Sequence, residues 1–292
     1  MFEGTYTALV TPFRGGRVDE QSLRTLIRAQ VEGGVDGIVP CGSTGESATM
    51  THDEHEQVIS IAIEEARGKI KVLAGTGSNS TAEACRLTKF AAEAGADGAL
   101  LISPYYIKPT QAGHVAHYRA IAEVSELPLL VYNIPGRTGV NMLPETTAEI
   151  ARIPHIVGIK EAAGSLDQVS RIIQLCGPGF TVLSGDDSLT LPMMAVGARG
   201  VISVVSNLAP KPICSLVRAA AAGDYETARR IHYELLPLMQ VLFIEINPIG
   251  IKTALAMTRK IASDELRMPL TPLTEPNRAR LEKALADAGL VG

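Results

Sequence analysis

One four-residue joint occurs three times in the sequence, as Gly34-Val35-Asp36-Gly37, Gly95-Ala96-Asp97-Gly98 and Gly197-Ala198-Arg199-Gly200. Each copy follows a helical pattern and opens a run of apolar residues. Glycine suits the first position because a helix C-cap often requires a positive φ angle. Three copies of one helix-to-strand joint predict a repeated βα architecture rather than two unlike domains.

Eight short apolar runs, rich in β-branched residues, extend this pattern along the chain. They are residues 6–10, 35–39, 71–74, 98–102, 127–131, 156–159, 181–183 and 200–203. Their spacing of roughly 20–36 residues, with helical periodicity between them, predicts an α/β fold with a parallel sheet. Eight units favour a closed (β/α)8 TIM barrel over a doubly wound sheet, because open sheets usually have fewer strands and two exposed edges.

The end of the chain has a different pattern. Three helical stretches, near residues 225–241, 248–261 and 275–288, follow one another with no strand between them. The sequence therefore predicts a catalytic barrel over residues 1–223 and a C-terminal helical appendage over residues 224–292.

Composition restricts the class of protein. The 292 residues are 46% hydrophobic, 20% charged and only 4% aromatic, with a net charge of −4. This balance indicates a globular protein, and it argues against a nucleic-acid partner, which would require a basic stripe. No apolar stretch is long enough to span a bilayer, and no signal-peptide pattern opens the chain. Four scattered cysteines are typical of a reduced, cytoplasmic protein.

In a barrel, the chemistry is expected where the strands end and the following loops begin. These positions are residues 41–46, 75–79, 103–106, 132–137, 160–161, 184–187 and 203–207. They bring one lysine, one arginine, several tyrosines and many hydroxyl groups together, without a cluster of metal ligands. Neither a complete G-x-G-x-x-G fingerprint nor a P-loop is present, so a bound dinucleotide or nucleoside triphosphate is not expected.

Lys160 ends an apolar strand and is the central candidate. Burial at a barrel mouth would disfavour the ammonium form and supply the free amine that attacks a carbonyl. A lysine at the end of an isolated strand more often extends toward water. The other candidate residues at the strand ends favour the interpretation of Lys160 as a nucleophile.

Three further features surround it. Gly42-Ser43-Thr44-Gly45-Glu46 can expose successive backbone N–H groups to a small anion, or it is an ordinary glycine-rich turn. Tyr132 can act as a general acid or base if its phenol is linked to Ser43 or Thr44. Otherwise its ring has only a packing role, with its own hydroxyl in contact with water. Arg137 can grip a carboxylate bidentately, or it is a solvated loop arginine.

His52 and His55 form an H-x-x-H pattern that could suggest a metal. Thr51 and Glu54, however, form a capping box, which places both histidines in the first turn of a helix. No third ligand has a suitable spacing, so no metal is predicted.

At these residues the sequence resembles the dihydrodipicolinate synthase (4-hydroxy-tetrahydrodipicolinate synthase) family of the pyruvate-dependent class I aldolases. The resemblance covers essentially the whole chain and rests on four motifs. These are Gly42-Ser-Thr-Gly-Glu46, Tyr132-Asn-Ile-Pro-Gly-Arg-Thr-Gly139, Ile159-Lys-Glu161 and Ser184-Gly-Asp-Asp187. The tyrosine and lysine are shared by the superfamily, whereas the Pro-Gly-Arg-Thr continuation is typical of the dipicolinate branch.

The resemblance implies condensation of pyruvate with L-aspartate 4-semialdehyde in the diaminopimelate and lysine pathway. Lys160 would form the Schiff base with pyruvate. Tyr132 would move protons together with Ser43, which is threonine in many members, and with Tyr106, which reaches a neighbouring subunit's site. The implied substrate contacts are Thr44, Gly185 and Ile202 for pyruvate and Arg137 for the aldehyde's carboxylate. No dissociable cofactor is implied.

The family also implies a homotetramer, a dimer of dimers, that L-lysine inhibits. The matching lysine-binding positions are Ser47, Ala48, His52, His55, Asn79, Glu83 and Tyr105. Two alternatives remain open. One is a sister enzyme, a 2-keto-3-deoxy-sugar-acid aldolase or N-acetylneuraminate lyase, against which Arg137 argues. The other is a non-catalytic barrel that senses a small molecule.

Overall fold

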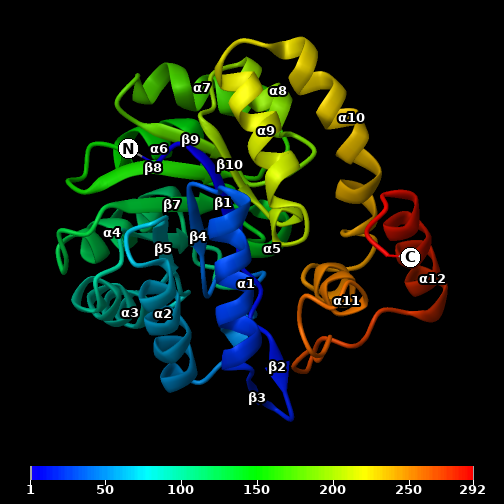
Figure 1. Ribbon diagram of the computed structural model, residues 1–292. Helices are drawn as coiled ribbons and strands as arrows, with labels where there is room; N and C mark the ends of the chain where they lie inside the picture. The colour runs from blue at the N-terminus through cyan, green and yellow to red at the C-terminus, as the bar shows by residue number, and fades with distance from the viewer. Residues whose placement is uncertain (1, 292) are drawn as a thin grey trace.

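The computed structural model describes residues 2–291, and eight parallel strands within them form a closed barrel (Figure 1). The strands are β1 (Gly4–Ala8), β4 (Gly37–Val39), β5 (Lys71–Gly75), β6 (Gly98–Ile102), β7 (Leu129–Asn133), β8 (Ile156–Glu161), β9 (Thr181–Ser184) and β10 (Gly200–Ser203). Strand β1 pairs in parallel with both β4 and β10, which closes the sheet. The predicted TIM barrel is therefore confirmed.

Helices alternate with these strands and surround the barrel (Figure 1). They are α1 (Glu20–Gly33), α2 (His52–Ala66), α3 (Thr81–Ala94), α4 (Gln111–Ala122), α5 (Pro135–Thr138), α6 (Pro144–Ile150), α7 (Leu166–Cys176), α8 (Thr190–Ala195) and α9 (Pro210–Ala221). Two short 3₁₀ helices, η1 (Ser47–Thr49) and η2 (Val205–Asn207), lie in the loops after β4 and β10. A hairpin of β2 (Phe13–Arg14) and β3 (Arg17–Val18) was not predicted, because two-residue strands show no periodicity.

The repeated joint behaves as predicted in two of its three copies. Gly34 and Gly95 are left-handed C-caps of α1 and α3, with φ angles of 75° and 89°. The third copy differs, because α8 ends at Ala195 and its C-cap is Val196, so Gly197 (φ 113°) lies one residue beyond the cap. Its positive φ still turns the chain toward β10, and the expectation that this glycine caps the helix is wrong.

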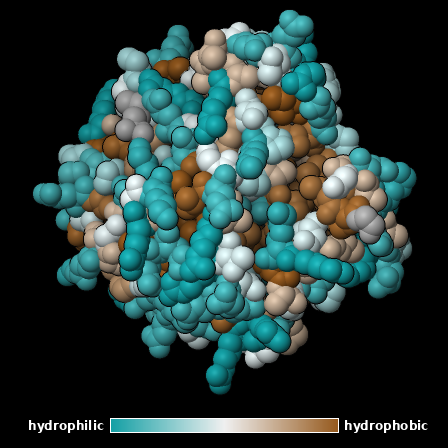
Figure 2. Space-filling view, in the orientation of Figure 1, coloured by the Kyte–Doolittle hydropathy of each residue, from teal (hydrophilic) through white to brown (hydrophobic). Residues whose placement is uncertain are grey.

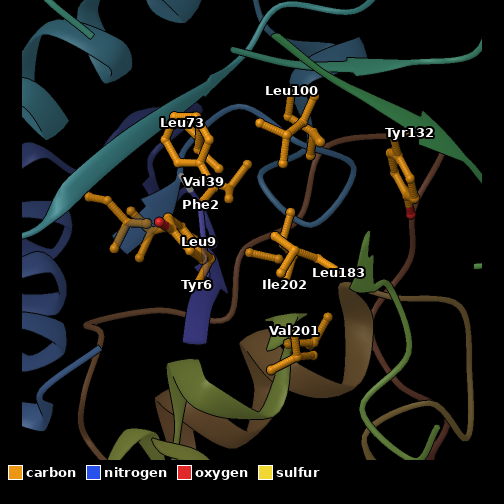
Figure 3. Close-up of a cluster of buried hydrophobic side chains, with 14 of the residues drawn as sticks. Phe2, Tyr6, Leu9, Val39, Leu73, Leu100, Tyr132, Leu183, Val201 and Ile202 are labelled. Carbon is orange, nitrogen blue, oxygen red and sulfur yellow. The ribbon is translucent and has the colours of Figure 1, made fainter. Parts of the chain in front are cut away.

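Apolar side chains fill the barrel. Figure 3 shows Phe2, Tyr6 and Leu73 gathered together, with Tyr132 standing apart and its phenol oxygen turned away from them. Tyr6 and Leu73 are fully buried, and each such side chain contributes roughly 2 kcal/mol through the apolar surface removed from water. Strands β7 and β8 end two residues later than predicted, so Tyr132 and Lys160 lie within the strands.

The C-terminal helical segment is confirmed as α10 (Tyr225–Val241), α11 (Ile249–Met257) and α12 (Glu275–Asp287). Helix α10 packs on α9, and α12 packs on both α10 and α11 beside the barrel (Figure 1). Figure 2 shows a largely hydrophilic face, with apolar residues gathered where these helices meet the barrel. Among residues 2–291, no helix combines the length and apolar character needed to cross a membrane.

Candidate active site

Lys160 projects from β8 and is buried, with 6% of its surface exposed. Its Nζ atom lies 4.2 Å from the centre of the Tyr132 ring. Burial lowers the pKa of Lys160 to about 7, and the carboxylate of Asp187 partly opposes that shift. The free amine is thus well populated at neutral pH, as a nucleophile that attacks a carbonyl requires.

Space beside Lys160 depends on a glycine. A Cβ atom at Gly185 would lie 3.0 Å from Lys160 Cε and 2.7 Å from Ala162 Cβ. The Gly185 N–H donates to the Glu161 carbonyl at 2.8 Å, which fixes the backbone at this close approach. The glycine therefore keeps the lysine's side chain free of a clash.

Tyr132 lies opposite Lys160 in the register between β7 and β8. Burial raises the pKa of Tyr132 far above its ordinary value, so the phenol keeps its proton. Within residues 2–291, no hydrogen bond joins this phenol to Ser43 or Tyr106. Tyr106 instead extends from the surface, 85% exposed, with a left-handed φ of 70°. The predicted proton relay is therefore not closed within one chain and stays a prediction.

The loop after β4 carries the backbone donors expected of an anion site. The Gly42 carbonyl accepts from the N–H groups of Gly45 and Ser47, and the Ser43 carbonyl accepts from that of Glu46. In the described part of the chain, the N–H groups of Ser43 and Thr44 donate to no protein acceptor. Two successive donors thus remain available at the cavity beside Lys160.

Asn247 belongs to this site and was missed by sequence reasoning. Its side-chain amide donates to Thr44 Oγ1 at 2.9 Å, and its backbone carbonyl accepts from Arg137 Nη2 at 2.8 Å. Its Oδ1 atom is buried and has no partner among residues 2–291. No local motif marks Asn247, because it comes from the segment between α10 and α11, far along the sequence from the residues it contacts.

Asp187 is a second residue without an assigned role in the sequence prediction, although it ends a quoted motif. Its buried carboxylate accepts hydrogen bonds from the Ser203 hydroxyl and from the N–H groups of Val204 and Val205. Burial raises the pKa of Asp187, and these hydrogen bonds oppose the shift. The carboxylate therefore caps the turn at the end of β10, the strand that carries the buried Ile202.

Three cavities that share lining residues surround this site. The smallest of the three, about 50 Å³, is lined by a set that includes Ser43, Thr44, Tyr132, Arg137, Lys160 and Gly185. A second, of about 300 Å³, shares Ser43, Tyr132 and Arg137. A third, of about 620 Å³, has Arg137, Gly185 and Asn247 in its wall. The lysine, the tyrosine and the arginine predicted from sequence therefore meet at one place, whereas the Ile202 side chain packs in the core.

Three of the residues predicted to bind lysine lie beside this site. Ser47, Ala48 and Tyr105 line the 300 Å³ cavity together with the catalytic candidates. The Asn79 amide donates to the Tyr105 carbonyl at 3.4 Å. Residues predicted to bind lysine and residues predicted to take part in catalysis therefore line the same cavity.

The other predicted lysine contacts lie at the start of α2 and α3. His52 Nε2 is 2.7 Å from Glu83 Oε1, and the Ser78 hydroxyl also donates to Glu83, which lowers the pKa of that carboxyl. His55 is buried and donates from Nε2 to the Gly75 carbonyl at 2.8 Å, and burial lowers its pKa. The His55 ring therefore lies against β5 and does not line the cavity.

The predicted capping box at the start of α2 is confirmed. Thr51 accepts from the Glu54 N–H, and Glu54 accepts from the Thr51 N–H. No group of three or more His, Cys, Asp or Glu side chains within residues 2–291 could hold a metal ion. The two histidines are thus explained by the helix start and by their protein partners.

Comparison with known proteins identifies the family. The model of the dihydrodipicolinate synthetase family matches residues 1–288. The 4-hydroxy-tetrahydrodipicolinate synthase of Syntrophobacter fumaroxidans is 56% identical over 291 residues, covering 100% of both chains. The Acinetobacter baumannii dihydrodipicolinate synthase, solved with pyruvate, has a TM-score of 0.97 and 44% identity over 100% of both chains. That of Cyanidioschyzon merolae, solved with lysine, has a TM-score of 0.96 and 42% identity over 99% of both. This chain belongs to the dihydrodipicolinate synthetase family.

Proposed function

We propose that this chain is a lyase that condenses pyruvate with L-aspartate 4-semialdehyde to 4-hydroxy-tetrahydrodipicolinate, in lysine and diaminopimelate biosynthesis. One observation carries the proposal: Lys160, with its pKa near 7, faces a cavity that Tyr132 and Arg137 also line. An amine, a proton carrier and a carboxylate-binding guanidinium are the groups that this reaction needs.

The chemistry follows from the free amine. Lys160 Nζ attacks the carbonyl carbon of pyruvate, and the oxygen leaves as water when the iminium forms. The iminium makes the methyl group acidic, and loss of a methyl proton gives the enamine. The enamine carbon then forms a bond with the aldehyde carbon. Finally, the amino group of the second substrate attacks the imine carbon, closes the ring and releases Lys160.

Each site residue has a proposed role. Tyr132, with Ser43 and the Tyr106 of a neighbouring subunit, moves the protons of these steps. The N–H groups of Ser43 and Thr44 bind the pyruvate carboxylate, supported by Gly185 and the Ile202 carbonyl. Arg137 faces the 620 Å³ space and binds the aldehyde's carboxylate. A sister aldolase acting on a keto-acid sugar would not use this guanidinium in that way.

Regulation and assembly are proposed on separate grounds. Lysine binds at the positions named above and slows the reaction, since three of those residues, Ser47, Ala48 and Tyr105, share a cavity with Ser43 and Tyr132. A homotetramer, a dimer of dimers, would bury the exposed Tyr106 and Ile107, which are 85% and 58% exposed in the single chain. We also propose a cytoplasmic location and a division of the chain into the barrel, 1–223, and the appendage, 224–292.

The proposal is tested by borohydride reduction in the presence of pyruvate, followed by mass analysis of peptides. A reduced pyruvyl adduct on Lys160 is expected, and an adduct elsewhere or none at all overturns the proposal. A panel of aldehydes then identifies the second substrate. Aspartate 4-semialdehyde should be consumed, and preferred turnover of a keto-acid sugar would assign the chain to the sister reaction instead.

A further inference from the structure

A buried ion pair joins the pyruvate-binding loop to the C-terminal helices. Lys252 Nζ, in α11, lies 2.6 Å from Glu46 Oε1, and both side chains are almost completely buried, at 0% and 1% exposed. The other carboxylate oxygen of Glu46 accepts from the backbone N–H of Arg267 at 3.1 Å. One carboxylate at the end of the loop is therefore held by two segments of the appendage.

The surroundings of this pair restrict its movement. Lys252 Nζ and Arg267 Cζ each lie 4.2 Å from the centre of the Phe13 ring. The Arg267 guanidinium also binds the Glu54 carboxylate and the carbonyls of Thr49 and Gly16. Because each cation has both an aromatic ring and an anion as partners, the Glu46 carboxylate has a fixed position.

The backbone conformation of Glu46 links its fixed carboxylate to the shape of the loop. Glu46 has a φ of 55° and a ψ of 35°, a left-handed conformation that residues other than glycine rarely adopt unless their surroundings hold them. The Glu46 N–H donates to the Ser43 carbonyl at 3.2 Å, and in this turn the N–H groups of Ser43 and Thr44 have no protein acceptor among residues 2–291. The side chain that is tethered and the backbone turn that exposes the donors belong to the same residue.

We infer that Glu46 and Lys252 are positioning residues that hold the Ser43–Thr44 donors in place for the carboxylate of a 2-keto acid. The inference rests on the proposed function. A buried pair of this kind contributes little net stability, because the cost of removing two charges from water offsets their attraction. The Glu46–Lys252 pair is therefore expected to affect ligand binding more than the stability of the fold.

The experiment measures pyruvate binding directly. Borohydride trapping at increasing pyruvate concentrations gives the half-saturating concentration for the parent protein and for four variants. These are Glu46→Gln, Lys252→Met, the double variant E46Q/K252M and, as a control, Glu265→Gln. Glu265 lies in the same segment and its charge also acts on Lys252, but it accepts hydrogen bonds from the N–H groups of Gly15 and Gly16 and makes none with Glu46. Melting temperatures are recorded in parallel.

The half-saturating pyruvate concentration should rise about tenfold or more in Glu46→Gln and in the double variant. This is the effect expected when the charge-assisted hydrogen bond between Glu46 and Lys252 is lost. In steady state, KM for pyruvate should rise while KM for the aldehyde stays within about twofold, and E265Q should match the parent. Lys252→Met alone leaves the buried Glu46 carboxylate unpaired and can therefore unfold the protein. The double variant removes both charges together, so it should stay folded.

Two results would overturn the inference. If E46Q and the double variant melt at lower temperature but are half-saturated at the parent's pyruvate concentration, the pair is only structural. If the parent forms the adduct while the variants show this result, only the inference fails and the proposed function is retained. No adduct in the parent at any pyruvate concentration overturns the proposed function, and this inference with it.

Discussion

Tyr132 and Lys160 lie directly opposite each other on β7 and β8, with the lysine nitrogen 4.2 Å from the centre of the tyrosine ring. Burial acts on the two side chains in opposite directions, since it lowers the pKa of the lysine and raises that of the tyrosine. Each shift favours the neutral form. The pair therefore offers a nucleophile and a proton donor at the same pH.

The rate of Schiff-base formation should rise as the pH passes through about 7 and level off above it. The lysine attacks only as the free amine, and its pKa is lowered to about 7 by burial. Borohydride trapping at a fixed, sub-saturating pyruvate concentration from pH 6 to pH 9 measures this rate. A rate that still climbs steeply between pH 8 and pH 9 contradicts the lowered pKa, and Lys160→Met is the control that gives no adduct.

Gly185→Ala should slow adduct formation about tenfold or more, with little change in fold. The added methyl group would press on Lys160 Cε at 3.0 Å and on Ala162 Cβ at 2.7 Å, which moves the amine from its attacking position. The matched control is Gly179→Ala, where a Cβ meets nothing within 4 Å. Equal trapping rates in the two variants would show that the lysine tolerates the methyl group.

Lysine at millimolar concentration should reduce turnover, and Glu83→Gln should raise the concentration for half-inhibition about tenfold. The Glu83 carboxylate pairs with His52 and accepts from Ser78, so it is the negative charge available to a ligand's ammonium group. Glu93→Gln, at the exposed far end of the same helix, should keep the parent's response. Equal turnover of the parent with and without lysine refutes the predicted regulation.

Acid should destabilise the fold through two histidines of α4. His114 and His117 are buried, and both ring nitrogens of His114 and Nε2 of His117 have no partner among residues 2–291. Burial lowers the pKa of His117 from 6.5 to about 4, so its contribution is complete above pH 6.5 and is lost as the pH falls toward 4. The free energy of unfolding should be about 2 kcal/mol lower at pH 5 than at pH 8 from His117 alone.

Urea denaturation at these two pH values measures the loss, and a variant isolates its cause. His114→Leu should reduce the difference between pH 8 and pH 5, because it replaces an imidazole that has no hydrogen-bond partner among residues 2–291 by an apolar side chain. His155→Asn, at an exposed position, should leave the difference unchanged. A larger pH effect in His114→Leu than in the parent would contradict the assignment.

The local sequence determined much of this protein. Three glycine joints and eight apolar runs predict the barrel, because strand-to-helix alternation is a short-range pattern. Lys160 and Tyr132 lie near the carboxyl ends of two strands of that barrel, and Ser43, Thr44 and Arg137 lie in loops that follow strands, so the rule that strand ends meet at one mouth brings them together. The capping box at Thr51 and Glu54 is likewise complete within four residues.

Only the tertiary structure decided which distant groups complete the site. Asn247 contacts Thr44 and Arg137, and Lys252 neutralises Glu46, across more than two-thirds of the chain in the longest case. No spacing in the sequence predicts such pairs, since they depend on how the appendage packs against the barrel. The lowered pKa of Lys160 has the same origin: the residue type permits a nucleophile, but the exclusion of water by its packed neighbours produces one.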